Sequence, residues 1–225
     1  MNILKRILNI IFPAACRQCG GSVSSDAPTA YFCKICWDAI KWFDSPCRKN
    51  PLSFDEAISA GPYEGVLAEA IKLFKYKKKI HVGRALADFS PFTKGGLRGI
   101  MGIEGLQSCH IIPVPLHPSR LREREFNQSA ILASVIGERL GIPLLTDVLL
   151  RERYTRPQVE LDMKERKKNV VGAFTVQNEE LIVDKNIILV DDVYTTGSTV
   201  NECAKVLKKN GSGKVYVVTI ARMVG

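Results

Sequence analysis

The sequence predicts an α/β fold whose sheet is mainly parallel, preceded by a small module that holds a metal ion through four cysteines. Short apolar runs typical of buried strands alternate with helical segments over most of the chain, which is the pattern of a parallel sheet with helices on both faces. Two Cys-x2-Cys pairs stand close together near the N-terminus. One apolar run ends in two aspartates and a turn rich in hydroxyl side chains.

The composition is that of a globular protein. Of the 225 residues, 46% are apolar and 24% are charged, so the chain can bury a full core without disulfides. The apolar content excludes an intrinsically disordered chain, and no apolar run reaches the roughly 18 to 20 residues that a transmembrane helix needs. The net charge of +9 favours partners that carry phosphate or carboxylate groups, although a merely solubilising surface would have the same charge.

The four N-terminal cysteines have the spacing of a zinc site. Cys16-x2-Cys19 is followed, after thirteen residues, by Cys33-x2-Cys36. In each pair a short turn aims two thiolates at one point, so the four together suit a tetrahedral structural Zn2+. Zinc would then fold a segment too short for a core of its own. The alternative is a disulfide framework, which requires a secreted protein, and nothing else in the sequence supports secretion.

The residues before Cys16 allow two interpretations. Basic residues, an apolar stretch and a small-small-Cys ending resemble a short bacterial lipoprotein signal. However, Asn9 and Pro13 interrupt the apolar stretch, and lipidation of Cys16 would leave the other three cysteines without a fourth ligand. A short amphipathic helix that packs on a neighbouring surface is favoured by the helical spacing of Leu4, Ile7, Leu8 and Ile11.

We expect two parts, a four-cysteine zinc-binding module over residues 1–50 and an α/β domain over residues 51–225. The Pro-flanked stretch from Ser45 to Pro51 is the expected linker, and Cys47 within it receives no role. The glycine-rich residues 93–107 are expected to form a mobile loop. Hydrophobic periodicity and turn residues predict, in chain order, a strand at 57–60, helices at 66–74 and around 86–89, a strand at 109–114, a helix at 126–140, a strand at 187–190, a helix at 200–207 and a strand at 215–220.

The most specific segment begins with the strand at 187–190. This strand delivers Asp191 and Asp192 to its C-terminal end, where ligands of open α/β sheets bind. A turn from Thr195 to Thr199, with Gly197 at its centre, then leads into a helix. The N–H groups at that helix start and the hydroxyls would cradle one phosphate, while the two carboxylates suit a ribose diol. These features predict a ribose-5-phosphate site; the plainer alternative is a helix cap beside two solvated aspartates.

This segment resembles the signature of type I phosphoribosyltransferases, which bind 5-phosphoribosyl-1-pyrophosphate (PRPP). The resemblance implies that Asp191 and Asp192 contact the ribose hydroxyls. It also implies a second loop that holds the pyrophosphate with Mg2+, for which Pro113-Val114-Pro115 is the best candidate. The residues implied for the 5′-phosphate are Thr195, Thr196, Gly197, Ser198 and Thr199.

Three arginines come shortly after the second loop in the sequence. Arg120, Arg122 and Arg124 would steer or cover a pyrophosphate if the loop binds one. The alternative is a solvated helix start in which Glu123 and Glu125 balance the arginines.

Further motifs occur in the order found in the competence protein ComF family, which the chain resembles over nearly its whole length. Glu125 departs from the family, which usually has glycine there, and Cys47 stands alone where some relatives have further paired cysteines. The motifs that follow the cysteine pairs are Phe74-Lys75-Tyr76, Pro113-Val114-Pro115-Leu116, Arg124-Glu125-Phe126-Asn127-Gln128, Arg153-x-Thr155-x-x-Gln158, Arg166-x-x-Asn169-Val170 with Ala173-Phe174, and the phosphate loop.

The ComF resemblance implies a role in DNA uptake during natural transformation. The protein would handle incoming single-stranded DNA in the bacterial cytoplasm, with other proteins of the uptake machinery as partners. The alternative is an active phosphoribosyltransferase that transfers the phosphoribosyl group of PRPP to an unknown acceptor and releases pyrophosphate. The sequence assigns no catalytic residue.

A cluster of lysines is the candidate for DNA binding. Cations beside an aromatic ring fit a phosphate track with a platform on which a base stacks. The same cluster would also fit a solvated helix end, where cations favour the helix dipole. Because two of its members belong to the family motif, they could instead line the PRPP pocket. The cluster consists of Lys72, Lys75, Tyr76, Lys77, Lys78 and Lys79.

Overall fold

The computed structural model describes residues 14–43, 47–49 (by their backbone), 52–93, 97, 106, 108–153 and 170–224. The amphipathic helix expected before Cys16, most of the loop expected at 93–107 and most of the motifs between 153 and 169 lie outside these residues. The elements are α2 (Lys34–Asp38), β1 (Cys47–Lys49), β2 (Glu56–Pro62), α3 (Gly65–Tyr76), α4 (Ile80–Phe89), β3 (Cys109–Pro113), α6 (Pro118–Arg124), α7 (Gln128–Leu140), β4 (Leu149–Arg151), β5 (Phe174–Val176), η3 (Glu179–Leu181), β6 (Asn186–Tyr194), α9 (Ser198–Lys209) and β7 (Val215–Arg222).

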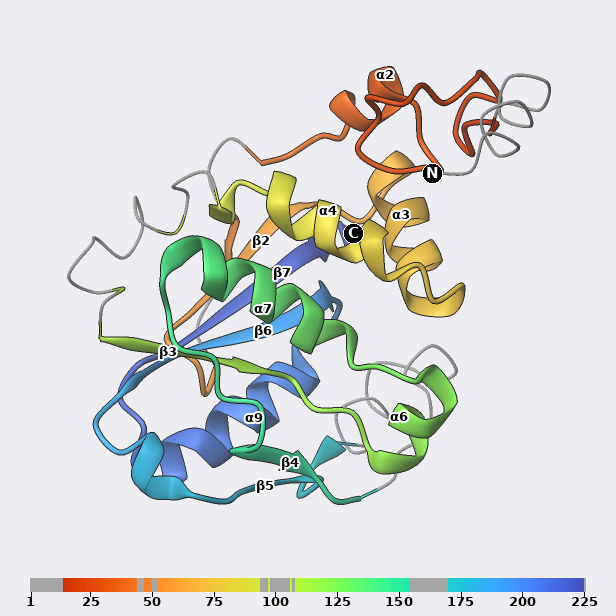
Figure 1. Cartoon of the computed structure of the whole chain (residues 1–225). Coiled ribbons are helices and arrows are strands. Elements are labelled where there is room, and N and C mark those ends of the chain that lie inside the picture. The colour runs from red at the N-terminus through yellow and green to blue at the C-terminus, as the bar shows by residue number, and fades with distance from the viewer. Residues whose placement is uncertain are drawn as a thin grey trace.

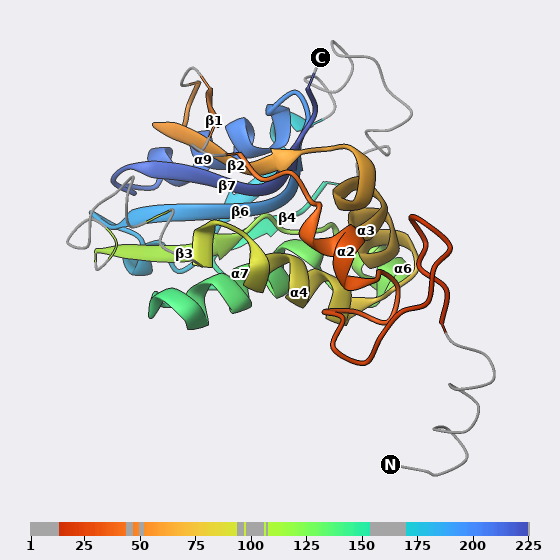
Figure 2. The ribbon, with the colours of Figure 1, turned by 90° about the horizontal axis from the view of Figure 1, so that it is seen from above.

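A five-stranded sheet forms the centre of the molecule (Figure 1). Its strand order is β1-β2-β7-β6-β3, and β2, β7, β6 and β3 are parallel to one another. Helices α3, α4 and α7 cover one face and α9 covers the other, as the view from above shows (Figure 2). The predicted α/β fold with a mainly parallel sheet and helices on both faces is therefore confirmed.

Strand β6 shows why the sheet needs both layers. Its side chains alternate between the two faces. Ile188 and Val190 belong to the core under α3, α4 and α7, whereas Ile187 and Leu189 belong to the core under α9. All four are at most 1% exposed, which explains the unbroken apolar run in the sequence.

The two sides of the parallel strands end differently within the described residues. On one side the three-residue strand β1 pairs antiparallel with β2 and is the edge strand of the sheet. At the other edge, Ile111 of β3 makes a parallel bridge with Leu144. The backbone N–H of Ile111 donates to Pro143 O at 2.8 Å, and the N–H of Leu145 donates to Ile111 O at 2.9 Å.

The expected elements are present, and the most informative difference is at β6. This strand continues beyond the expected residue 190 to Tyr194, because Asp191, Val193 and Tyr194 keep their ladder positions opposite β7. Helix α9 begins at Ser198, two residues earlier than expected. The turn between strand and helix is therefore short, and the two aspartates lie on rigid strand backbone.

The four-cysteine segment packs against α3 and α4 (Figures 1 and 2). The ring of Trp37 meets Phe89 edge-on with centroids 6.1 Å apart, and Tyr31 stacks on His81 at 5.5 Å. Buried Phe32 and Trp37 join the same core as the helices. Strand β1, which falls inside the range expected for the zinc module, lies at the edge of the sheet, and the boundary at residue 50 stays a prediction. None of the helices in the described part of the chain has the length and apolar character needed to cross a bilayer.

Candidate functional site

A cavity of about 1010 Å3 lies at the C-terminal edge of the parallel strands. Parallel pairing brings the ends of β2, β7, β6 and β3 to this one edge, so residues far apart in the sequence meet there. The cavity is large for a small-molecule site, which usually measures roughly 300 to 1,000 Å3. Its lining includes Tyr63 after β2, Met223 after β7, Asp191 and Asp192 in β6, and Val114 after β3.

Asp191 is held by two hydrogen bonds at the cavity wall. Its Oδ1 accepts from Ser129 Oγ at 3.0 Å and from the backbone N–H of Asp192 at 2.8 Å. Burial, together with the neighbouring charge of Asp192, raises the pKa of Asp191 to about 6, well above the 3.8 of a free aspartate. Ser129 was not predicted as a site residue; it stands in the first turn of α7, one residue after the family motif that ends at Gln128.

Asp192 forms a buried ion pair with Lys75 of α3. The Lys75 Nζ lies 2.7 Å from Oδ2 and 3.0 Å from Oδ1 of Asp192. The side chains of Lys75 and Asp192 are only 22% and 7% exposed. Although burial lowers it, the Asp192 carboxylate raises the pKa of Lys75 above its usual range, so the ammonium stays charged. This pair ties α3 to the end of β6.

The hydroxyl-rich turn forms a second, small hollow that adjoins the cavity. Asp191, Thr195 and Thr199 line both spaces, and Gly197 and Ser198 line the small one. Gly197, at φ 76°, is the N-cap of α9, and a Cβ there would meet the Tyr194 hydroxyl. Because the cap residue has no side chain, it adds no acceptor of its own to the helix start, where the Ser198 N–H donates to Thr196 Oγ1 at 3.4 Å. Thr196 belongs to the same turn but lines neither space; its Oγ1 lies 2.9 Å from Ser198 Oγ.

The loop after β3 forms another part of the cavity wall. Val114 and Pro115 line the cavity, whereas Pro113 is the last residue of β3 and does not. Asn127 Nδ2 donates to Val114 O at 3.0 Å, and this bond holds the loop to the start of α7. Of the three arginines in α6, Arg120 and Arg124 line the cavity.

Helix α6 ends in a left-handed residue where the family usually has glycine. Glu125 is its C-cap, with φ 70°, a conformation that glycine adopts without steric cost. The turn therefore forms here with a glutamate, whose carboxylate pairs with Lys78 Nζ.

The lysine cluster is divided between the cavity and the surface. Lys75 is buried on Asp192, while Lys72 and Lys77 line the cavity and Lys72 pairs with Glu69 at 2.7 Å. Lys79 lies over the ring of Tyr31, 5.5 Å from its centroid. Lys78, the remaining lysine of the cluster, pairs with the carboxylate of Glu125. These residues thus do not form one continuous exposed track.

Tyr76 lies at the rim of the cavity. It is 55% exposed, and the Arg124 guanidinium lies 5.6 Å from its ring centroid. A half-exposed ring with a cation on one side keeps ring surface accessible to solvent.

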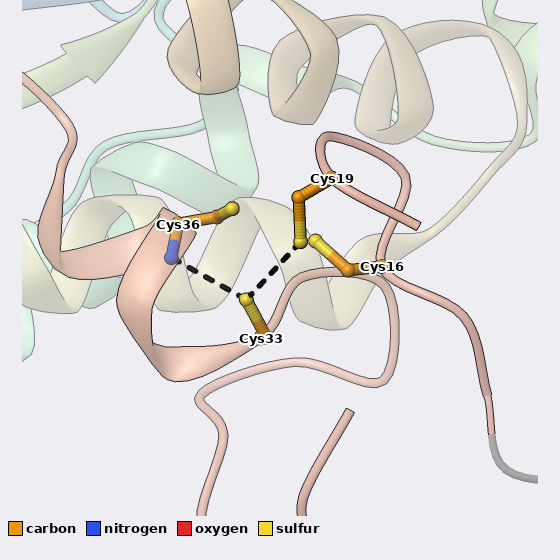
Figure 3. Close-up of side chains that lie close together, drawn as sticks. All are labelled: Cys16, Cys19, Cys33 and Cys36. Carbon is orange, nitrogen blue, oxygen red and sulfur yellow. Dashed lines mark hydrogen bonds between the residues drawn. The ribbon is translucent and has the colours of Figure 1, made fainter. Parts of the chain in front are cut away.

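The four N-terminal cysteines form one cluster (Figure 3). All four Sγ atoms lie within 4.8 Å of one another, and those of Cys19 and Cys33 are 3.8 Å apart. Burial raises the pKa of Cys16, but hydrogen bonds from the backbone of Cys33, Cys19 and Gln18 outweigh it and lower the pKa to about 6. A hydrogen bond with Cys33 raises the pKa of Cys36 to about 12. The cluster could hold a metal ion, and binding would displace the shared thiol protons.

Three further lining residues were not predicted. Arg151 ends β4, Tyr63 follows β2, and Arg17 stands inside the first cysteine pair. Their side chains belong to different parts of the sequence and share no motif, so only the fold brings them together.

Comparison with known proteins agrees with this architecture. The chain is 31% identical over 200 residues to competence protein F of Haemophilus influenzae, an alignment that covers 85% of this chain and 84% of that protein. The chain belongs to the competence protein ComF family. The predicted family membership is thus confirmed.

Other relatives of the family give the same result. A DNA utilization protein, YhgH, of Salmonella typhimurium is 30% identical and covers 78% of this chain and 76% of its own length. Competence protein ComFC of Streptococcus pneumoniae is 32% identical over 49% of this chain and 47% of its own length. The family model for the phosphoribosyl transferase domain matches residues 127–223, which contain both aspartates and the hydroxyl-rich turn.

The pKa of Asp191 predicts a pH-dependent stability difference. Because the pKa in the folded protein, about 6, exceeds the 3.8 of the unfolded chain, the folded state binds the proton more tightly. The stabilisation from this group is complete below about pH 4 and is lost as the pH rises through 6. We expect Asp191→Asn to become more stable relative to wild type across this window, as measured by urea unfolding at each pH. Ser129→Ala removes a bond that favours the carboxylate and should move the transition to higher pH. A stability difference that stays constant from pH 4 to 7 would contradict the assignment.

Proposed function

We propose that the protein acts in DNA uptake in the bacterial cytoplasm, where it handles incoming single-stranded DNA, and that its cavity binds PRPP or a similar ribose-5-phosphate ligand. One observation supports the ligand: the acidic pair Asp191 and Asp192, the hydroxyl-rich turn and several cationic side chains all lie at one cavity. The DNA role is supported by the names of the relatives, which describe competence and DNA utilization.

In this proposal each wall of the cavity binds one part of the ligand. Asp191 and Asp192 accept hydrogen bonds from the ribose hydroxyls. The turn from Thr195 to Thr199 holds the 5′-phosphate with backbone N–H groups and hydroxyls. The loop Pro113-Val114-Pro115, with Arg120 and Arg124 nearby, binds the pyrophosphate. Mg2+ would arrive with the phosphates, since this ion is usually held by phosphate oxygens, waters and few protein groups.

Lys75 has a defined part in this arrangement. Both oxygens of Asp192 now face its ammonium, so a ribose hydroxyl must share or replace that contact. The pair holds the Asp192 side chain in place at the cavity wall before the ligand binds. The pair therefore preorganises the Asp192 carboxylate as an acceptor, while the Lys75 ammonium competes with the ribose hydroxyl for it.

We also propose that the four cysteines hold one structural Zn2+. With Zn–S bonds of about 2.3 Å, a regular tetrahedron has S···S edges of about 3.8 Å. The separation of 3.8 Å between the Cys19 and Cys33 sulfurs matches this edge. It is also far beyond the length of a disulfide, about 2.05 Å.

The zinc site predicts one equivalent of metal per chain. Elemental analysis of the purified protein should find close to one zinc, and Cys33→Ser should lose most of it because three thiolates bind the ion less tightly. Cys203→Ser, at a buried thiol outside the cluster, should keep its zinc. Less than half an equivalent in the wild type, or disulfides among the four cysteines, would contradict the site.

The ligand site predicts magnesium-dependent PRPP binding. Asp192→Asn keeps the shape of the side chain but removes the charge, and a charged hydrogen bond contributes roughly 1.5 to 3 kcal/mol. Calorimetry should therefore show about 10-fold weaker binding or worse. Asp184→Asn makes the same chemical change at an exposed turn and should leave the affinity unchanged. If the wild type does not bind PRPP with Mg2+, the ligand proposal fails; equal affinity in Asp192→Asn removes only the residue assignment.

The DNA role predicts a salt-dependent interaction with single strands. Each phosphate contact adds about −0.7 to the slope of log K against log salt. Replacing Lys77, Lys78 and Lys79 by alanine should therefore flatten the slope by up to about two units. Replacing the exposed lysines Lys185, Lys205 and Lys209 removes the same charge elsewhere and should change the slope little. An unchanged slope in the first triple variant would remove these lysines from the DNA-binding surface.

The aromatic ring predicts a different signature. If a base stacks on the exposed ring of Tyr76, Tyr76→Ala should weaken binding of single strands by about 1 to 3 kcal/mol with almost no change in the salt slope. Loss of PRPP affinity without loss of DNA affinity would instead assign Tyr76 to the ligand.

A further inference from the structure

The four-cysteine segment supplies one cation to the wall of the cavity. Arg17 follows Cys16 directly and stands two residues before Cys19, so it lies inside the first metal-binding turn. Its side chain lines the same cavity as Asp191, Asp192 and Thr195. The metal cluster and the ligand cavity therefore share a single stretch of backbone.

The charge balance of the cavity favours an anionic occupant. Seven arginine and lysine side chains line it against three carboxylates, Glu69, Asp191 and Asp192. Two of the cations are neutralised by these acids, Lys72 by Glu69 and Lys75 by Asp192. Among the described residues, Arg17 makes no side-chain hydrogen bond or ion pair. Its guanidinium is thus available to a ligand that brings its own negative charge.

The place of Arg17 depends on the turn between the two cysteines. Its backbone N–H donates to Tyr31 O at 2.9 Å, which joins the first cysteine pair to the chain that leads into the second. Around it, Cys16 N donates to Gly21 O at 2.7 Å and Gly20 N to Cys16 O at 2.8 Å. These few backbone bonds hold a segment with little regular structure. A metal bound by both Cys16 and Cys19 would restrict the conformation of Arg17, which lies between them.

The module itself is anchored beside the cavity. Tyr31 stacks on His81 of α4, and the Lys79 ammonium lies over the Tyr31 ring, 5.5 Å from its centroid. Because Tyr31 also accepts the Arg17 N–H, the anchor and the cavity residue are one hydrogen bond apart. The orientation of Arg17 therefore follows that of the metal-binding turn.

We propose that Arg17 is an anion-binding residue of the cavity and that the metal in the cysteine cluster positions it, so that metal occupancy and affinity for the PRPP-type ligand are linked. This inference rests on the proposed ligand site. Arg17 forms charge-assisted hydrogen bonds with a phosphate oxygen of the bound ligand, and its planar fork favours two such bonds at once. By linkage, the factor by which the metal raises ligand affinity equals the factor by which the ligand raises metal affinity.

The first experiment measures PRPP affinity with Mg2+ by calorimetry on the zinc-loaded full chain. Arg17→Ala should keep one zinc, because all four cysteines remain, and should bind PRPP roughly 10-fold more weakly or worse. Arg17→Lys keeps the charge without the fork and should fall between the two. Arg84→Ala removes an exposed arginine of α4 outside the cavity and should match wild type. Equal affinity in Arg17→Ala and wild type overturns the proposal, whereas no binding by the wild type overturns the ligand site on which it rests.

The second experiment tests the link to the metal and needs no metal-free protein. Zinc loss to an excess of a chelating dye is followed with and without saturating PRPP and Mg2+. We expect PRPP to slow zinc loss in the wild type and in Arg84→Ala, and to have at most a small effect in Arg17→Ala. If PRPP protects zinc equally in Arg17→Ala, the coupling passes through the packing of the module on α3 and α4, and Arg17 is not its carrier. If PRPP protects zinc in none of the variants, metal and ligand are not linked.

Discussion

The parallel pairing of β2, β7, β6 and β3 is the constraint on which the rest of the molecule depends. A parallel sheet must be covered by helices on both faces. Here α7 packs over one apolar core and α9 packs over the other. The same pairing places all four strand ends at one edge, so the polar residues that follow the strands must lie together there. The site is thus a consequence of topology, and its two aspartates gain precision because β6 continues through them as a paired strand.

The ion pair between Lys75 and Asp192 is the electrostatic counterpart of this arrangement. A buried carboxylate without a partner would be costly, and the adjacent Asp191 already has a raised pKa because of burial and of its neighbour's charge. Lys75 relieves this repulsion by holding one of the two charges at 2.7 Å. Helix α3 is therefore part of the site, although it lies more than a hundred residues away in the sequence.

Local patterns in the sequence predicted the parts of the protein that depend on local geometry. The cysteine spacing predicted the sulfur cluster, and the run of strand, aspartates and hydroxyls predicted the turn at α9, because neighbouring residues alone determine these shapes. The partner of Asp192, the hydrogen bond of Ser129 and the cavity position of Arg17 could not be predicted in this way. Each depends on how helices and loops pack across the sheet, and the local periodicity of the sequence does not predict this packing. The lysine cluster illustrates the same limit: consecutive residues of one helix end point partly into the cavity and partly to solvent.

The two edges of the sheet have a consequence for how this chain meets other molecules. An open strand edge offers a row of unpaired backbone groups to which a peptide or a second copy can add a strand. Here β1, with only three residues, is the edge strand on one side, and the Pro143–Leu145 segment bonds to Ile111 on the other. A very short edge strand is one of the features by which proteins limit pairing between sheet edges. A strand added beside β1 would therefore gain few backbone hydrogen bonds, and one added beside β3 would compete with the Pro143–Leu145 segment.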